Sequence, residues 1–275
     1  MAGDCIDDQD RAVEGFEKVS HTIPAALAGS VLRIAGYRET AGAITHQTET
    51  ASLLVPLIVS FAAPFEIGLG RQPTADDRFS SFTAGLYGGP VRIRSRGEAC
   101  CLQIDFTPLA AYRFFGLPMR LLRDRMVHLD DLGDAGVSGL ARRLADTRTW
   151  RQRFAITEAF VADRLNRGAT PSPGVAWGYR QLVGTGGRMP ISALAESVGW
   201  SRKHLAARFR EEVGASPKTV ARIARFNRAV AVARSDTAGG WADVAAACGY
   251  ADQAHLVREF GTFAGATPAA WRAVA

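Results

Sequence analysis

Residues 194–217 read LAESVGWSRKHLAARFREEVGASP, and residues 244–268 read VAAACGYADQAHLVREFGTFAGATP. These two stretches are one pattern written twice. Ala195 and Gly199 recur as Ala245 and Gly249, fifty residues later. One extra residue then enters the second copy, and the later matches lie 51 residues apart: Ser201, His204, Leu205, Phe209, Gly214 and Pro217 recur as Asp252, His255, Leu256, Phe260, Gly265 and Pro268. A repeat this detailed predicts two copies of one supersecondary unit.

Each copy has the pattern of two helices joined by a tight turn. In the first copy, Gly199 is expected to end the first helix in the left-handed backbone region that other residues resist. Ser201 suits the N-cap of the second helix, because its hydroxyl can accept from the free N–H groups there. Leu205 and Phe209 are spaced i,i+4 and are expected to face inward. The pattern predicts a helix-turn-helix, in which the outward face of the second helix enters the major groove of DNA.

The net positive charge lies entirely in the part of the chain that holds the repeat. The formal net charge is +6 at pH 7; residues 174–275 hold 13 Arg and Lys against 7 Asp and Glu, whereas residues 1–173 hold 20 of each sign. This asymmetry is typical of a domain that binds a polyanion. Because the excess is modest, it favours a site-specific DNA reader over a nonspecific coating protein. A merely solvated basic surface is the alternative that charge leaves open.

The length of 275 residues suits two domains. We expect a flexible N-terminal tail over residues 1–25, a regulatory domain over 26–168, a Pro-rich linker over 169–174 and a DNA-binding domain over 175–275. The expected fold class is α+β. A small β-barrel or sandwich with following helices comes first, and an all-α domain that contains both helix-turn-helix motifs comes second.

Short β-prone runs separated by turns fill the chain from residue 30 to residue 106. Strands are expected at 31–34, 53–61, 65–69, 82–87, 91–95 and 101–106. Helices are expected near 108–115, 118–126, 134–146, 149–167, 175–184 and 218–234.

The sequence contains no sign of export or membrane insertion. The acidic first residues lack the basic and apolar blocks of a signal peptide. The longest apolar run, residues 51–65, is too short for a membrane span and is interrupted by Pro56 and Pro64. The four cysteines have no framework spacing. We therefore expect a cytoplasmic protein with no membrane partner.

The repeated motifs resemble those of the AraC/XylS family of bacterial transcription regulators. The first copy resembles the family's first DNA-reading unit from Ala195 to Lys218, and the second resembles the family signature from Ala247 to Pro268. The resemblance implies a domain of about seven helices whose two units enter successive major grooves, about 34 Å apart. The N-terminal half resembles the family's regulatory domains more loosely. In that family such a domain binds an effector, dimerises, or does both.

The first copy offers five outward positions for contact with DNA bases: Arg202, Lys203, Ala206, Ala207 and Arg210. Lys203 is the best candidate for a guanine edge, whose O6 and N7 are acceptors. Ala206 and Ala207 can only touch a thymine methyl group or leave room for water. Arg208 lies beside the inward-facing Phe209 and binds either phosphate or a neighbouring carboxylate.

The second copy presents a different outward face, made of Gln253, Ala254, Val257 and Arg258. Gln253 can pair with adenine through two hydrogen bonds, and Arg258 with guanine. Arg258 aligns with Ala207, so the two units should read different sequences and the site should be asymmetric.

Ser201, His204 and His255 suit contacts with the DNA backbone that fix the register. For the two histidines, packing within each turn is an equally weighted alternative. Arg222, Arg225 and Arg228 recur every third residue of the long helix between the copies, where they contact phosphate or are simply solvated.

Two neighbouring thiols supply the rival hypotheses. Cys100 and Cys101 lie in an expected strand, so their side chains point to opposite faces, and buried thiols are the favoured interpretation. The alternatives are a DNA-linked enzyme of the alkyl-transfer kind and a redox sensor that uses this pair. No nucleophile–base pattern stands out, and we assign no catalytic residue and no cofactor.

Two further sequence patterns are weaker indications of a binding site. His46 and Glu49 suit a metal site only weakly, and a solvated role is favoured, so no metal site is assigned. Arg92, Arg94 and Arg96 alternate along a strand, which favours a solvated outer face over a site for an anionic effector.

The sequence predicts a DNA-binding transcription regulator, an activator or a repressor, whose N-terminal domain modulates binding through an effector, dimerisation, or both. The expected partners are duplex DNA spanning two major grooves, a small-molecule effector, a second copy of the chain, and RNA polymerase if the protein activates.

Overall fold

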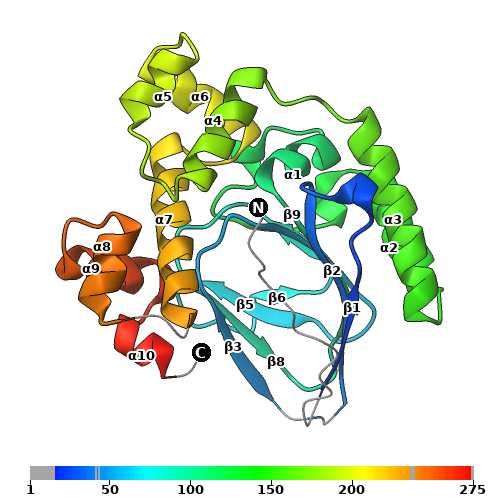
Figure 1. Cartoon of the computed structure of the whole chain (residues 1–275). Coiled ribbons are helices and arrows are strands. Elements are labelled where there is room, and N and C mark those ends of the chain that lie inside the picture. Colours follow the sequence, from blue (N-terminus) through cyan, green and yellow to red (C-terminus); the bar gives the residue numbers. More distant parts are fainter. Residues whose placement is uncertain (1–15, 41, 43, 236–238, 274–275) are drawn as a thin grey trace.

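The computed structural model describes residues 16–40, 42, 44–235 and 239–273, which form a β-rich N-terminal domain and a helical C-terminal domain (Figure 1). Two antiparallel sheets lie in the first domain, and the helices of the second gather on one side of them. This arrangement agrees with the predicted α+β class and with the predicted order of the two domains.

Among the residues that the structure describes, the larger sheet has six strands in the order β1-β2-β9-β4-β7-β10. Its strands are β1 (Phe16–His21), β2 (Val31–Glu39), β9 (Cys100–Phe106), β4 (Val55–Ser60), β7 (Phe82–Ala84) and β10 (Met126–His128). In the same described part of the chain, the smaller sheet has four strands in the order β3-β8-β5-β6, namely β3 (Thr45–Glu49), β8 (Val91–Ser95), β5 (Phe65–Leu69) and β6 (Arg78–Phe79).

Strand β9 shows how alternation separates two environments. Leu102, Ile104 and Phe106 are fully buried and belong to the main core, which they share with the helices over that face. Cys101, Gln103 and Asp105 leave the strand on the opposite side and line a cavity. One face of the large sheet therefore supports the helices, and the other faces a hollow.

Three α-helices and three single-turn 3-10 helices complete the N-terminal domain. They are α1 (Pro108–Phe115), α2 (Ala135–Ala145), α3 (Trp150–Arg167), η1 (Ala25–Leu27), η2 (Met119–Leu121) and η3 (Asp130–Leu132) in the described chain. The start of α1 is fixed by Thr107, whose hydroxyl accepts from the Ala110 amide at 3.3 Å, and by Pro108 in the first turn. Phe114 of α1 packs on Phe106 of β9 with ring centroids 4.7 Å apart.

The C-terminal domain contains, within the described residues, the seven helices that the resemblance implied. They are α4 (Pro173–Gly184), α5 (Ile191–Ser197), α6 (Arg202–Glu212), α7 (Pro217–Arg234), α8 (Trp241–Cys248), α9 (Gln253–Ala264) and α10 (Pro268–Arg272). Helix α7 spans 18 residues. At 1.5 Å per residue it is about 27 Å long. The α5–α6 pair and the α8–α9 pair lie toward its two ends (Figure 1), and we call them the first and second reading heads.

The structure corrects several expected elements. The helix expected near 118–126 is only the turn η2 followed by strand β10, because Asp124 adopts a left-handed φ of 54° and Met126–His128 pair with β7. Within the tail expected over 1–25, residues 16–21 instead form β1, paired along β2. Residues 1–15 lie outside the described residues. Strand β3, of sequence THQTE, was not expected because it contains no apolar residue.

We expect Gly199→Ala to lower the free energy of unfolding by about 1–2 kcal/mol, since a left-handed backbone costs an L-residue about that much. The φ of Gly199 is +68°, and an added Cβ would meet no other atom within 4 Å, so the loss would come from the backbone alone. Urea unfolding of the full chain measures it.

The matched control is Gly261→Ala, inside α9 and also free of close neighbours. That change should raise stability by about 0.5–1 kcal/mol, because alanine loses less backbone entropy in a helix than glycine does. Equal effects of the two substitutions would contradict the assigned turn.

Candidate nucleic-acid interface and internal cavity

The first reading head is built as its sequence predicted. Gly199 adopts the left-handed conformation with φ of 68°. Ser201 caps α6, because its hydroxyl accepts from the His204 amide at 3.1 Å. Leu205 and Phe209 are fully buried. The turn and the cap therefore fix the direction in which α6 leaves the head.

The second reading head repeats this construction. Gly249 has a φ of 76°, and the Asp252 carboxylate accepts from the His255 amide at 2.6 Å at the start of α9. The two histidines also repeat: His204 meets the Trp200 ring edge-on at 4.7 Å, and His255 meets the Tyr250 ring at 5.1 Å. This geometry supports the packing role for both imidazoles, which still retain exposed surface.

Most of the residues predicted to contact DNA lie on open faces of α6 and α9. Arg202, Lys203, Ala207 and Arg210 are exposed on α6, and Ala206 is half-buried. On α9, Gln253, Ala254 and Arg258 are exposed, whereas Val257 is half-buried. The described chain therefore leaves each recognition helix with an uncovered side.

Arg208 is used inside the protein. Its guanidinium donates to Glu212, whose carboxylate is fully buried. The backbone amide and hydroxyl of Ser172 donate to the same carboxylate at 2.7 and 2.8 Å. Of the two roles considered for Arg208, the structure favours the neighbouring carboxylate, and this cluster ties α6 to the start of α4.

Arg222 and Arg225 of the arginine stripe on α7 contact the second head. Arg222 Nε donates to Glu259 Oε1 at 2.7 Å. The Arg225 guanidinium lies 5.4 Å from the centre of the Tyr250 ring, a cation–π contact. Arg222 and Arg225 therefore have partners within the protein and are not simply solvated.

Direct hydrogen bonds join the second head to the N-terminal domain. The Ala51 amide donates to the Phe263 carbonyl of α9 at 2.9 Å, and Asn227 Nδ2 of α7 donates to the Ala51 carbonyl at 2.8 Å. At the first head, Arg120 Nε donates to Glu211 at 2.9 Å. Both heads therefore touch the N-terminal domain, and the second is held at Ala51.

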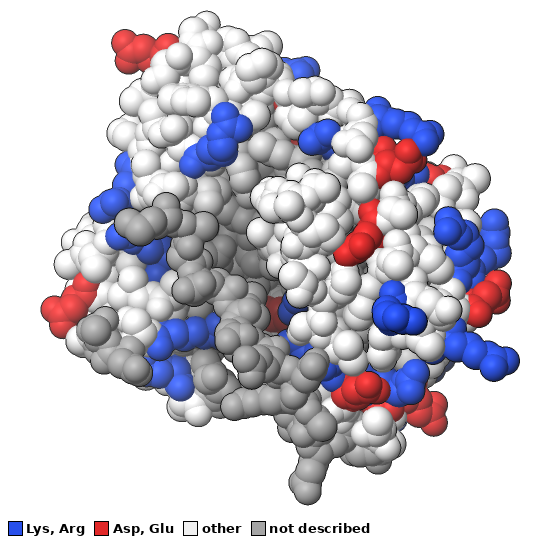
Figure 2. All heavy atoms as spheres, turned by 45° about the vertical axis from the view of Figure 1, so that its right-hand side comes forward, with Lys and Arg blue, Asp and Glu red and all other residues white. Residues whose placement is uncertain are grey.

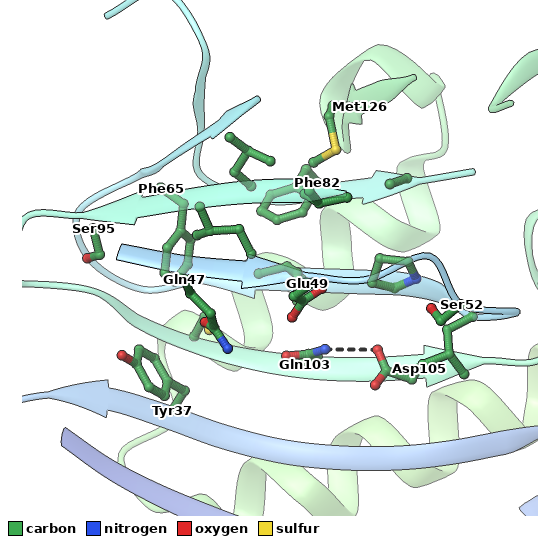
Figure 3. A pocket seen from close by; sticks show the side chains of 18 of the residues that line it. Tyr37, Gln47, Glu49, Ser52, Phe65, Phe82, Ser95, Gln103, Asp105 and Met126 are labelled. Atoms are coloured by element: carbon green, nitrogen blue, oxygen red, sulfur yellow. Dashed lines mark hydrogen bonds between the residues drawn. The ribbon is translucent and has the colours of Figure 1, made fainter. Parts of the chain in front are cut away.

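Ala51 also lines an internal cavity of about 560 Å³ between the two sheets. This volume lies within the range of about 300–1,000 Å³ typical of small-molecule sites. Phe65 of the small sheet and Phe82 and Met126 of the large one line it (Figure 3), and Ile67 and Ile58 also belong to its lining.

Sequence reasoning missed this cavity and its polar residues. On β9, Gln103 Nε2 donates to Asp105 Oδ1 at 2.9 Å, and Arg33 Nε of β2 donates to Asp105 Oδ2 at 2.7 Å. Glu49 of β3 also lines the cavity. Burial raises the pKa of Glu49, and Asp105 raises it further, while Arg33 opposes the shift. The available signal was the alternation of polar Gln103 and Asp105 with apolar residues along β9.

Cys101 is poorly suited to the chemistry that the rival hypotheses require. Cys101 faces the cavity, and burial, together with the charges of Cys100 and Glu39, raises the pKa of its thiol to about 12. A thiol with such a pKa is almost wholly protonated at neutral pH and is a poor nucleophile. Cys100 leaves β9 on the opposite face, as predicted.

The two weaker patterns also find a structural explanation. Arg94 and Arg96 both pair with the buried Glu66 carboxylate, which leaves β5 on the face away from the cavity. His46 and Glu49 are an odd number of residues apart on β3, so their side chains leave on opposite faces. Among the described residues, no group of three His, Cys, Asp or Glu is placed to hold a metal ion.

The face turned forward in Figure 2 carries mixed charges. Lys and Arg side chains are interspersed with Asp and Glu there, without a continuous patch of one sign. This mixture agrees with the balanced charge of residues 1–173. None of the helices in the described part of the chain has the length and apolar character needed to cross a bilayer.

Comparison with known proteins gives one family match and several solved structures of similar shape. Residues 194–273 match the family model of a helix-turn-helix domain. No curated protein matches the sequence. ToxT from Vibrio cholerae shares 11% identity over 88% of this chain and 98% of that chain, with a TM-score of 0.45.

Two further structures were found in the same comparison. ToxT bound to an unsaturated fatty acid shares 10% identity over 89% of this chain and 95% of its own, with a TM-score of 0.44. The AraC-like transcriptional activator CuxR shares 13% identity over 75% of this chain and 79% of its own, with a TM-score of 0.30.

We expect Cys101 in the native protein to react with iodoacetamide at pH 8 about a thousandfold more slowly than a free cysteine, because its raised pKa leaves few thiolates and the strand covers it. Mass spectrometry of timed, quenched samples measures the rate. The same thiol in urea-unfolded protein is the control and should react at the free rate. Fast native labelling would revive the reactive-thiol hypotheses.

Proposed function

We propose that the protein is a sequence-specific DNA-binding transcription regulator of the AraC type, controlled through its N-terminal domain, and the match of residues 194–273 to a helix-turn-helix domain supports this proposal. The observation that carries this proposal is the pair of capped recognition helices, α6 and α9, which belong to one domain and each keep an exposed face. Two such helices on one protomer suit a site that spans two major grooves.

The dimensions of the domain are compatible with this mode of binding. Helix α7 separates the heads and is about 27 Å long, close to the roughly 34 Å of one turn of DNA. Its buried side, which includes Val220, Ile223 and Phe226, holds it within the domain core. A spacer packed in this way presents both heads with little loss of conformational entropy on binding.

The assignment of base contacts follows the exposed side chains. Lys203 on α6 is the candidate for a guanine edge, whereas Gln253 and Arg258 on α9 are candidates for adenine and guanine. Ala206 and Ala207 add only small apolar contacts. We therefore propose that the second head supplies more of the sequence discrimination than the first.

Control by a small molecule is supported by the position of the cavity. Ala51 lines the cavity and is hydrogen-bonded to both α7 and α9. A ligand that binds one arrangement of residues 50–54 better than another would shift the position of the second head. The effector site that we propose is therefore directly linked to the part of the protein that reads DNA.

Further partners follow from the same role. A second copy of the chain would double the contacts with an operator, and RNA polymerase is the natural partner if the protein activates. Action on chromosomal DNA in a bacterium requires a cytoplasmic location.

We expect Arg258→Ala to weaken binding to the selected operator by about 1–3 kcal/mol and to relax the preference at one base pair. The operator would first be selected from random duplexes with the full-length protein, and binding would be measured by fluorescence anisotropy at fixed salt.

Arg142→Ala, which removes the same charge from the exposed surface of α2, is the matched control and should leave both quantities unchanged. If Arg258→Ala weakens binding equally on every sequence, Arg258 contacts phosphate and not a base.

We expect Asn227→Ala to speed hydrogen exchange of the Ala51 amide by about fivefold, the effect of losing roughly 1 kcal/mol from one hydrogen bond. The Asn227 amide holds the Ala51 carbonyl, and its loss should loosen the contact between domains. Hydrogen–deuterium exchange with mass spectrometry measures the rate. Asn166→Ala, on the exposed side of α3, is the control. Unchanged exchange would remove this contact from the proposed link.

A further inference from the structure

The cavity between the sheets is lined partly by apolar residues and partly by charged ones. Its apolar part includes Phe65, Ile67, Phe82, Ile93 and Met126, and these residues also form a small core of their own with Ile58 and Cys101. Such a wall accepts an aromatic or bulky aliphatic group and stabilises it by about 25 cal/mol per Å² of apolar surface removed from water. The chemical identity of a ligand is therefore decided by the polar groups.

Most of the charged groups at the cavity already have partners. Asp105 is held by Arg33 on one oxygen and by Gln103 on the other. Glu39 accepts from Ser95 at 2.5 Å and from the Ala99 amide at 2.8 Å, among other donors. Because Arg33 is engaged with Asp105, its positive charge is not free for a ligand carboxylate.

Glu49 is different. Its side chain is exposed, and it borders the hollow. Thr45 lies four positions away on β3 and therefore on the same strand face, and its hydroxyl donates to Glu39, which also lines the cavity. Across the described residues, the Glu49 carboxylate has no hydrogen bond or ion pair. An ammonium group of a ligand can therefore donate to this carboxylate without displacing a partner within the described protein.

The formal charges of the residues that line the cavity also favour a cationic ligand. Five residues with a formal charge line the described cavity, namely Lys18, Arg33, Glu39, Glu49 and Asp105. Three of these are acidic and two are basic. A ligand carboxylate would add a fourth negative charge beside an unpaired one, whereas a ligand ammonium group would balance it.

We propose that the cavity binds an apolar, preferably aromatic, organic amine in its protonated form, with Glu49 as the counter-ion and hydrogen-bond acceptor. This inference rests on the proposed role of the N-terminal domain as an effector-binding domain, and it names the chemical class of the effector. The rings of Tyr37 and Phe65, with centroids 6.5 Å apart on the cavity wall, add aromatic faces that favour a cation.

The test uses three probes that share one apolar body and differ in charge: phenylbutylamine, phenylbutanol and phenylbutyrate. Isothermal titration calorimetry at pH 7.5 on the full-length protein should give the tightest binding for the amine and the weakest for the carboxylate. In Glu49→Gln the amine should bind about 10- to 100-fold more weakly, since a charge-assisted hydrogen bond is lost. The alcohol should bind as it does to the natural protein, which also shows that the variant is folded.

Glu98→Gln is the matched control, because Glu98 is exposed in the turn between β8 and β9. It should leave all three affinities unchanged. The proposal is overturned if phenylbutyrate binds more tightly than phenylbutylamine, if Glu49→Gln leaves the amine affinity unchanged, or if none of the three probes binds.

A separate measurement distinguishes this inference from the proposed function. Binding of the selected operator is measured with and without saturating phenylbutylamine. Amine binding that depends on Glu49, without any change in DNA affinity, supports the cavity assignment and contradicts control through this site. Operator binding that is specific, together with failure of all three probes, supports the regulator and contradicts the amine site.

Discussion

The buried face of α7 is the constraint on which the DNA-binding domain depends. Val220, Ile223 and Phe226 are fully buried along one side of this helix. Phe226 packs against Phe260 and Phe263 of α9, with centroids 5.0 and 5.3 Å apart. Because a close-packed core tolerates little sliding, this face sets the spacing and orientation of the two heads together. Each head then needs only its own turn and cap to aim its recognition helix.

The two heads are equivalent in their turns and different in how the rest of the protein holds them. A buried carboxylate stabilises each one, Glu212 in the first and Glu259 in the second. Arg208 of the same helix pairs with Glu212, whereas Arg222 of the spacer helix pairs with Glu259. The first head is thus tied to α4 through Ser172, and the second to α7. The second head is also hydrogen-bonded to Ala51 of the N-terminal domain, which is the contact that we propose transmits changes to it.

The period of two along the strands connects the core with the cavity. On β9, Ile104 supports the helices while Asp105 faces the hollow, so one strand serves both the stability of the domain and its proposed ligand site. Glu49 contributes from the opposite sheet. It borders the hollow without a hydrogen-bond partner among the described residues, and for this reason we propose it as the counter-ion of a ligand.

The sequence by itself determined the parts of this protein that rest on local chemistry. Gly199, Ser201 and their equivalents act within a few residues of themselves, through backbone conformation and capping, so the two heads and several strands were predictable from short stretches. The exposed faces of α6 and α9 followed from helical periodicity. Strand β3 could not be predicted from periodicity, because its side chains face a hollow and not a core, and no apolar alternation marks it.

Tertiary structure alone decided which distant groups meet. Arg208 had two roles open to it in the sequence, and the packing of α6 against residue 172 selected the carboxylate. The Ala51 contact joins residues 176 positions apart, and the cavity brings Glu49 and Asp105 together from different sheets. Such pairings depend on how sheets and helices stack, which is settled by burial summed over the whole chain and not by any short stretch of it.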